Sequence, residues 1–422
     1  MRKCINKKIS IEITIIFILE KIEMKILIWY KKKNLKQVGG PSGYLYNLNS
    51  YFEESKKIEI SYIDNYFVNF FEKIIEKLKI SILKKKKIFY FGLEKEIVNL
   101  FQDLQIKDII DKKWLNNYDI IHFHESKKLY KNLKNIEKIK SIILLTSHSP
   151  QLATQEEFEL DSKFFLKFPL EVLEKYKEYE YVAFKRADYL IFPCREALEP
   201  YNKDSKMFEL LKTKKIKYLL TGIKEKKEVE DKEYFKNKYN IPKNSIIISY
   251  VGRHNEIKGY DILKEFAKEI LEKYKNVYFV IAGKEGPIEK LVHERWIECG
   301  WTTEGAKIMK NSDLFILPNR ETYFDLIFLE ALSLNCNILC SNTGGNKYFK
   351  KYESDKIIYF EKENTADMVN KFEYFYKDLK NIKSQNTNRE IFLKDFTVKK
   401  FGENYLKLME EILQESKNSE KI

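Results

Sequence analysis

The chain has 422 residues, a formal net charge of +14 and 44% hydrophobic residues. This is too much apolar material for a disordered chain and enough for two buried cores. It contains no run of 18 or more apolar residues, so the sequence predicts no membrane-spanning helix. The five cysteines are scattered and odd in number, which argues against a disulfide framework and fits reduced thiols in a cytosol.

The positive charge is almost entirely lysine, since only 7 of the 77 basic residues are arginines. We interpret most of it as a solvated lysine surface. Attraction to anionic lipid or to phosphate-bearing substrates is the alternative. Nucleic acid is not expected as a partner, because arginine, the residue suited to bidentate contacts with guanine and phosphate, is scarce.

The first 23 residues resemble a signal peptide only faintly. A basic stretch, Met1–Lys8, precedes the apolar stretch Ile9–Leu19, which Glu12 interrupts, and no small-residue cleavage site follows. We therefore predict that Met24 is the natural first residue, and that residues 1–23 are an extension from a misassigned start or a surface anchor.

From Met24 onward, short apolar runs alternate with longer amphipathic stretches, a pattern typical of βαβ units and a parallel sheet. The strands predicted in this first series are Ile26–Tyr30, Ile58–Ile63, Lys87–Phe91, Asp119–His124, Ile142–Ser147 and Tyr189–Pro193. The helices predicted between them are Tyr44–Glu54, Val68–Leu83, Glu94–Leu104 and Leu170–Arg186.

A second series follows the charged segment Lys224–Lys238. Its predicted strands are Ser245–Val251, Val277–Ala282, Leu314–Pro318, Asn337–Ser341 and Lys356–Phe360. Its predicted helices are Tyr260–Tyr274, Pro287–Glu294, Thr303–Lys310, Leu326–Leu334, Thr365–Leu379 and Val398–Glu415.

The two series predict an α/β protein with two Rossmann-like, doubly wound parallel-sheet domains that face each other across a cleft. We expect the boundary near Gly222, with domains at 24–221 and 222–396. Residues 397–422 are expected to form a C-terminal helix that packs back on the first domain, followed by a polar tail. Ligands of open α/β sheets bind beyond the carboxyl ends of the strands, so functional residues are sought there.

The first candidate cluster is the glycine-rich segment after the first strand. Gly39, Gly40 and Gly43 lie within five residues just before a helix, where backbone N–H groups and the helix N-terminus suit a phosphate. A simple tight turn is an equally good interpretation. The segment is neither Gly-x-Gly-x-x-Gly nor a Walker loop, which argues against a nicotinamide-dependent oxidoreductase.

The second cluster is formed by histidines. His122, His124 and His148 are three of the five histidines in the chain and lie at the ends of two neighbouring predicted strands. His148 is a candidate hydrogen-bond donor to a sugar hydroxyl or phosphate oxygen, and a structural role is the alternative. A zinc site is not favoured, because no cysteine or suitably spaced carboxylate accompanies the three histidines.

Two further clusters follow strands of the second series. Gly252, Arg253 and Lys258 surround a loop before a helix, which places two cations and a helix N-terminus where a diphosphate could lie. Glu330 is embedded in an apolar helix, where a carboxylate is costly unless it has a partner. The two hydroxyls of a ligand ribose would be such a partner.

The ordered set of Gly-Gly-Pro-Ser-Gly, Val-Gly-Arg-x4-Lys-Gly, Ser-Asp-Leu-Phe-Ile-Leu-Pro and Leu-Glu-Ala resembles the retaining glycosyltransferases of the GT-B fold, family 4, or group 1 glycosyl transferases. The resemblance covers most of the chain from Met24. It implies transfer of a hexosyl-type sugar from a UDP- or GDP-sugar to a glycan or lipid-linked glycan, in bacterial surface polysaccharide or lipopolysaccharide synthesis. It also implies that no metal or other cofactor is needed.

The resemblance further implies roles for single residues. Arg253 and Lys258 would hold the diphosphate and stabilise it as the leaving group, Glu330 would bind the ribose, and His148 would lie near the transferred sugar. The donor-binding set is Gly39, Gly40, Gly43, Gly252, Arg253, Lys258 and Glu330.

One position departs from the family pattern. The first glutamate of the Glu-x7-Glu motif is replaced by Thr322, and the Glu-Gly-Phe-Gly of the family reads Thr322-Tyr-Phe-Asp325. Three alternatives stay open for the missing group: Glu321 after a one-residue shift, Asp325, or Thr322 together with loop amides.

The acceptor is expected on the N-terminal side. Phe67–Lys87 is amphipathic and ends in four lysines, which suits peripheral contact with an anionic membrane surface on the cytoplasmic face. A core-facing helix with a solvated end is the alternative. For the whole chain, a GT-B-like sugar-nucleotide epimerase and a degenerate, non-catalytic assembly partner remain alternative functions.

Overall fold

The computed structural model describes residues 24–37, 39–54, 59–63, 112–153, 170–229, 231–378 and 387–419. Four sequence predictions lie outside the described residues: the extension 1–23, the segment Phe67–Lys87 with its helix, the strand Lys87–Phe91 and the helix Glu94–Leu104.

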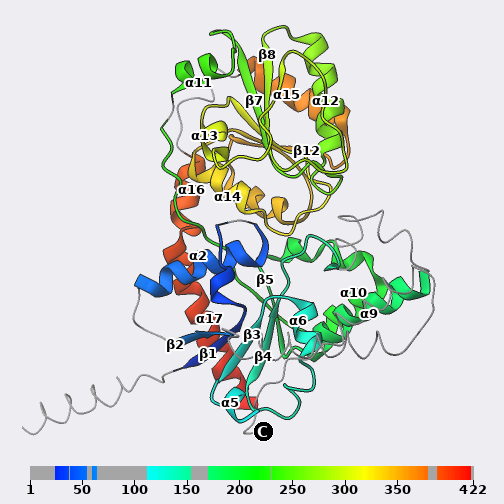
Figure 1. Ribbon diagram of the computed structural model, residues 1–422, viewed down its shortest axis with the longest axis vertical. Helices are drawn as coiled ribbons and strands as arrows, with labels where there is room; N and C mark the ends of the chain where they lie inside the picture. The colour runs from blue at the N-terminus through cyan, green and yellow to red at the C-terminus, as the bar shows by residue number, and fades with distance from the viewer. Residues whose placement is uncertain are drawn as a thin grey trace, which may run out of the picture.

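Two parallel sheets, each of six strands within the described part, form the frame of the molecule (Figure 1). The strand order is β2-β1-β3-β4-β5-β6 in the first sheet and β12-β11-β10-β7-β8-β9 in the second. The first sheet comprises β1 (Lys25–Trp29), β2 (Glu59–Tyr62), β3 (Ile120–Phe123), β4 (Ile142–Thr146), β5 (Tyr189–Phe192) and β6 (Lys215–Tyr218). The second comprises β7 (Ile246–Val251), β8 (Val277–Ala282), β9 (Trp296–Glu298), β10 (Leu314–Leu317), β11 (Ile338–Ser341) and β12 (Ile357–Phe360).

The central strands are nearly continuous apolar runs because helices cover both faces of each sheet. Every residue of β3, β4, β10 and β11 is buried. The α-helices are α2 (Gly40–Glu54), α5 (Lys112–Leu115), α6 (Ser126–Lys131), α9 (Leu170–Arg186), α10 (Ser205–Thr213), α11 (Lys232–Lys238), α12 (Tyr260–Lys273), α13 (Gly305–Lys310), α14 (Leu326–Ser333), α15 (Thr365–Asp378), α16 (Thr387–Asp395) and α17 (Val398–Ser419). Four 3₁₀ helices join them: η1 (Lys32–Asn34), η2 (Arg195–Leu198), η3 (Tyr201–Lys203) and η4 (Gly344–Tyr352).

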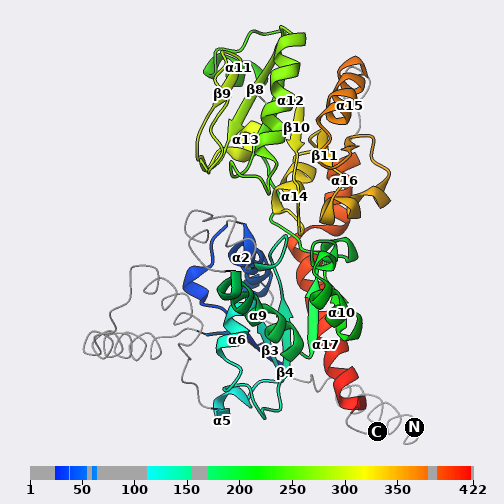
Figure 2. The same ribbon diagram turned by 90° about the vertical axis from the view of Figure 1, so that its right-hand side faces the viewer.

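The chain crosses between the two sheets twice, and the crossings lie side by side. Ile223 on the first crossing pairs with Thr397 on the second, and its N–H donates to the carbonyl of Phe396 at 2.9 Å. After the second crossing, α17 runs back along the first sheet and packs on α2 (Figures 1 and 2). A Cβ at Gly402 of α17 would lie 2.1 Å from the ring of Tyr51, so glycine permits this close approach.

One predicted helix is wrong. Pro287–Glu294 forms no helix, and the short strand β9 follows it instead. Trp296 of β9 pairs with Phe279 at the edge of β8. The two rings are stacked, with centroids 5.5 Å apart. Pairing of this apolar residue with the sheet therefore outweighs the weak helical pattern of the preceding segment.

Several elements were not predicted at all. The edge strand β6 alternates lysine with apolar residues and is only partly buried, so it lacks the apolar run by which the other strands were found. The helix α11 lies inside the charged segment Lys224–Lys238, where Asp231 caps it by accepting from the N–H of Tyr234 at 2.9 Å. The helices α10 and α16, the short helices α5 and α6, and the four 3₁₀ helices were also not predicted.

Candidate active site

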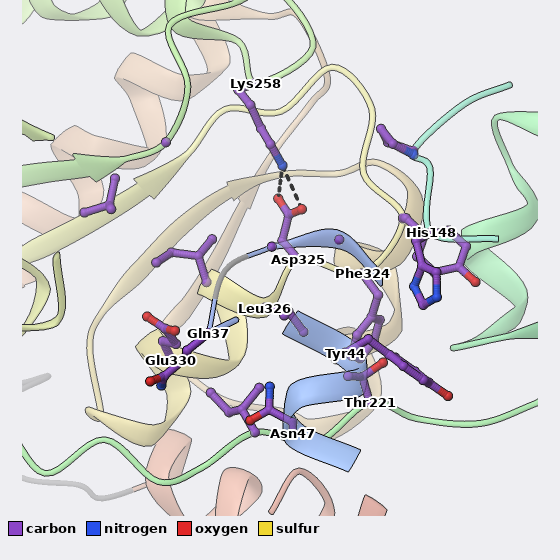
Figure 3. A pocket seen from close by; sticks show the side chains of 18 of the residues that line it. Gln37, Tyr44, Asn47, His148, Thr221, Lys258, Phe324, Asp325, Leu326 and Glu330 are labelled. Carbon is purple, nitrogen blue, oxygen red and sulfur yellow. Dashed lines mark hydrogen bonds and ion pairs between the residues drawn. The ribbon is translucent and has the colours of Figure 1, made fainter. Parts of the chain in front are cut away.

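A cavity of about 600 Å³ lies between the two halves, beyond the carboxyl ends of β1, β4, β7 and β10 (Figure 3). Eight of the predicted site residues line it. The cavity therefore brings together candidate donor-binding residues from both halves of the chain. The lining residues are Gln37, Gly39, Gly40, Tyr44, Asn47, His148, Pro150, Thr221, Ile223, Val251, Gly252, Arg253, Lys258, Tyr323, Phe324, Asp325, Leu326, Ile327 and Glu330.

The glycine-rich segment forms the first turn of α2, so this helix begins at Gly40 and not at Tyr44 as predicted. Gly40 has a φ of +69°, a conformation that favours glycine, and a Cβ at Gly39 or Gly40 would meet no atom within 4 Å. The backbone is therefore open to close approach by a ligand. Gly43 is not among the lining residues; its carbonyl accepts from the side-chain amide of Asn47 at 2.8 Å.

Arg253 and Lys258 lie on the loop between β7 and α12. The hydroxyl of Tyr250 donates to the carbonyl of Arg253 at 2.7 Å, and the N–H of Lys258 donates to the Oδ1 of Asn255 at 3.1 Å. These bonds fix the backbone at both cationic positions. Both side chains line the cavity, as the diphosphate hypothesis requires.

The Lys258 ammonium is paired with the Asp325 carboxylate, at 2.7 Å to Oδ1 and 2.8 Å to Oδ2 (Figure 3). Asp325 precedes α14 as its N-cap residue but makes no side-chain capping bond. The side-chain amide of Asn319 donates to its Oδ2 at 2.8 Å. A carboxylate and a cation therefore face each other at the point where a donor diphosphate is expected.

Glu330 lies on α14 and lines the same cavity. Burial raises the pKa of its carboxyl group, and the ion pair with Lys226 at 3.3 Å opposes that rise. Lys226 is thus a partner for the Glu330 carboxylate within the protein itself, in the role for which the sequence analysis expected the hydroxyls of a ligand ribose. Its side chain is still 22% exposed, so it remains reachable from the cavity.

The three candidates for the missing glutamate occupy different environments. Asp325 lines the cavity, whereas Thr322 and Glu321 are not among the lining residues. Thr322 is fully buried, and its hydroxyl has no hydrogen-bond partner among the described residues. Glu321 is bound by Lys203 from the first half of the chain and by Lys362 from the second, the latter at 2.8 Å.

This arrangement predicts a structural effect for Glu321→Gln. Removing the charge leaves two lysines without their carboxylate partner, and we expect the free energy of unfolding to fall by about 1–3 kcal/mol. Nucleotide affinity should change less than about threefold, since the side chain is directed into an ion-pair network rather than the cavity. Denaturant unfolding and calorimetric titration measure the two quantities. A lost nucleotide affinity with unchanged stability would instead assign Glu321 to the site.

His122, His124 and His148 form one cluster, in which His122 and His124 are buried and only the partly exposed His148 lines the cavity. His122 is hydrogen-bonded through Nε2 to Thr146 Oγ1 at 2.8 Å and through Nδ1 to the hydroxyl of Tyr405 at 3.0 Å. His124 Nδ1 lies 3.0 Å from His148 Nε2. Hydrogen bonds at both ring nitrogens account for His122 as a structural residue. His124 holds the His148 ring at the cavity wall, and its own Nε2 has no partner among the described residues.

Burial makes these histidines neutral bases. It lowers the pKa of both His122 and His148 to about 3, and it lowers that of His124 well below its usual value. His148 is therefore suited to hydrogen bonding with a sugar or phosphate as an uncharged imidazole, and not to neutralising a diphosphate by its charge.

The same depressed pKa values predict sensitivity to acid. The unfolded chain binds protons at histidine below pH ~6.5, whereas the folded cluster does so only near its lowered pKa. Stability is thus present above pH ~6.5 and is lost as the pH falls, by about 2 kcal/mol per histidine at pH 5. Denaturant unfolding at pH 7 and pH 5 should show a smaller loss in His148→Gln than in the wild type. An equal loss in both proteins would contradict a neutral, buried His148.

Sequence reasoning missed several lining residues. Tyr44 and Asn47 lie one turn apart on α2 and face the cavity with Gly40, a helical spacing that could have indicated them. Tyr323 and Phe324 appear in the sequence analysis only within the Glu-Gly-Phe-Gly comparison, where Tyr323 departs from the family pattern and Phe324 matches it. Thr221 and Ile223 carried no signal, since the crossing of the chain between the sheets places them there.

Two searches of the described residues bear on cofactors and membranes. They contain no group of three or more His, Cys, Asp or Glu side chains placed to hold a metal ion. None of their helices has the length and apolar character needed to cross a membrane. Metal-independent catalysis remains a prediction.

Comparison with known sequences finds a family match in the second half of the chain. Residues 231–390 match the family described as Glycosyl transferases group 1. An uncharacterized glycosyltransferase of Methanocaldococcus jannaschii is 26% identical over 265 residues, which are 55% of this chain and 64% of that protein. The O-antigen biosynthesis glycosyltransferase WclY of Escherichia coli is 23% identical over 189 residues, 43% of this chain and 51% of WclY.

A third relative is the UDP-Gal:alpha-D-GlcNAc-diphosphoundecaprenol alpha-1,3-galactosyltransferase of Escherichia coli. It is 30% identical over 129 residues, 28% of this chain and 33% of that enzyme. The matches with these curated relatives thus span between about a third and two thirds of the relatives' lengths.

Solved structures match nearly the whole chain at low identity. Sucrose-phosphate synthase from Thermosynechococcus elongatus has a TM-score of 0.65 and 13% identity, with 93% of this chain and 99% of that chain covered. HepE of Anabaena, solved in complex with UDP-glucose, has a TM-score of 0.58 and 12% identity, with 92% and 100% covered. The expected GT-B fold is confirmed, and the glycosyltransferase resemblance that the motifs indicated is supported by the match of residues 231–390 to the glycosyl transferases group 1.

Proposed function

We propose that the chain is a retaining glycosyltransferase that moves a hexosyl-type sugar from a nucleotide-sugar to a glycan or lipid-linked glycan. The observation that carries the proposal is the convergence of Arg253, Lys258, the α2 glycines and the α14 N-terminus on one cavity between the two sheets. Cations, open backbone and helix N-termini together are suited to a diphosphate.

The proposed mechanism needs no divalent ion. Arg253, Lys258 and the backbone N–H groups of the α2 turn neutralise the diphosphate as the bond to the sugar breaks. The sugar passes through an oxocarbenium-like state, and the acceptor attacks from the face that the diphosphate leaves. Closure of the two halves would exclude water from this step.

The named relatives support a UDP-hexose and a surface-glycan acceptor. The HepE structure holds UDP-glucose, one Escherichia coli relative uses UDP-Gal and a diphosphoundecaprenol-linked sugar, and WclY serves O-antigen biosynthesis. By these likenesses we assign this chain a UDP-sugar donor and a role in bacterial surface polysaccharide synthesis. A cytoplasmic location with peripheral membrane contact through Phe67–Lys87 belongs to the same proposal.

A thermal-shift screen against UDP-, GDP-, ADP- and CMP-sugars tests the donor class. We expect a UDP-hexose to raise the melting temperature most, because binding to the folded state stabilises it by mass action. No shift with any of the four classes would contradict the proposal.

A second function, a non-catalytic assembly partner, is favoured by one observation. Thr322 replaces the glutamate of the family motif and is buried away from the cavity. Such a protein would bind a UDP-sugar and never release UDP from it, whereas a transferase releases UDP when an acceptor glycan is supplied.

A further inference from the structure

Asp325 is an acidic lining residue that the family pattern does not provide. Among the described lining residues only Asp325 and Glu330 carry carboxylates. Glu330 already has Lys226 as its partner, and Glu321 is held in a separate ion-pair network. Asp325 is therefore the carboxylate that a donor bound beside Lys258 would contact.

The position of Asp325 at the N-terminus of α14 indicates which part of a bound donor it would contact. It precedes Glu330 by five residues, so the two lie about 7.5 Å apart along the helix axis. In Figure 3 Asp325 appears between Glu330 on one side and His148 on the other. A nucleotide-sugar with its ribose at Glu330 would thus bring its diphosphate and sugar past Asp325.

Binding of that donor requires an exchange of partners. A diphosphate that takes the Lys258 ammonium removes both short contacts, at 2.7 and 2.8 Å, from the Asp325 carboxylate. The carboxylate keeps the bond from Asn319, at 2.8 Å, and is left close to another anion. It then needs new hydrogen-bond donors, because a desolvated carboxylate without partners is costly.

We propose that Asp325 is a specificity-determining residue, which exchanges Lys258 for hydroxyl groups of the donor's sugar and thereby selects neutral hexoses against acidic ones. Sugar hydroxyls donate to the carboxylate, whereas the carboxylate of a uronic acid repels it. The inference rests on the proposed function, since it takes a nucleotide-sugar as the ligand.

The test is calorimetric titration of the full chain with UDP, UDP-glucose and UDP-glucuronate. In the wild type we expect UDP-glucose to bind about tenfold or more tightly than UDP-glucuronate, because like charges at close range in a partly buried site repel strongly. Asp325→Asn should reduce this preference by about fivefold or more, since the amide carries no charge. The affinity of Asp325→Asn for UDP should be equal to or higher than that of the wild type, because no carboxylate then competes with the diphosphate for Lys258.

Glu363→Gln is the matched control. It is also a carboxylate-to-amide change in the second half of the chain, but Glu363 is half exposed and pairs with Arg320 at 2.7 Å outside the cavity. This variant should keep the wild-type preference.

The outcomes separate the inference from the proposed function. If the wild type binds UDP-glucose and UDP-glucuronate equally, or if Asp325→Asn keeps the full preference, the role of Asp325 is overturned while UDP binding stands. If the wild type binds neither UDP nor either sugar nucleotide, the proposed function itself fails. Equal wild-type affinities for the two sugar nucleotides overturn the inference without any variant, so the test can refute it even if Asp325→Asn does not fold.

Discussion

Lys258→Ala is expected to lower kcat/KM for sugar transfer by about 100- to 1,000-fold, the usual effect of removing one electrostatic stabiliser of a developing charge. The change removes the ammonium that faces the cavity and leaves the Asp325 carboxylate, formerly at 2.7 Å from it, opposite the diphosphate. Nucleotide affinity and initial rates with a glycan acceptor measure the effect.

A double variant separates the lost attraction from the new repulsion. Lys258→Ala combined with Asp325→Asn should bind UDP more tightly than Lys258→Ala alone, because the unpaired carboxylate is gone. Circular dichroism and melting temperatures establish that both variants are folded. Transfer by Lys258→Ala at the wild-type rate would refute the diphosphate role.

Gly259→Ala is expected to destabilise the second half of the chain by about 3 kcal/mol or more. Gly259 has a φ of +66° at the start of α12, and a Cβ there would lie 1.8 Å from the carbonyl oxygen of Pro318. The loop bearing Lys258 would have to move, so UDP affinity should fall along with the free energy of unfolding. Denaturant unfolding and titration with UDP measure the two effects.

Gly300→Ala is the matched control for backbone strain. Gly300 has a similar φ of +63°, but a Cβ there would meet no atom within 4 Å. We expect a loss of about 1 kcal/mol and unchanged UDP affinity. Equal destabilisation by the two substitutions would show that the close contact with Pro318 contributes nothing.

Much of the architecture could be predicted because parallel strands buried on both faces leave a strong apolar signal. The strands at Ile142–Thr146 and Leu314–Leu317 are continuous apolar runs and were found where the structure has them. The edge strand β6, with its two lysines, gives no such signal. The strand β9 is determined by the contact of Trp296 with a distant ring, which no local pattern contains.

The candidate site was predicted in part for a similar reason. Gly252, Arg253 and Lys258 follow a strand directly, so the topology alone places them at the cavity. The partners of Glu330 and Glu321 could not be foreseen. Lys226 lies 104 positions from Glu330 within the second half, and Lys203 lies 118 from Glu321 across the two halves, so only tertiary packing brings each pair together.

A crystal structure of the chain with UDP tests the central claim most directly. We predict the diphosphate against Arg253 and Lys258, the ribose within hydrogen-bonding distance of Glu330, and the Lys258–Asp325 ion pair broken. UDP bound outside the cavity between the two sheets, or bound there with the ion pair intact and Arg253 distant from the phosphates, would contradict it.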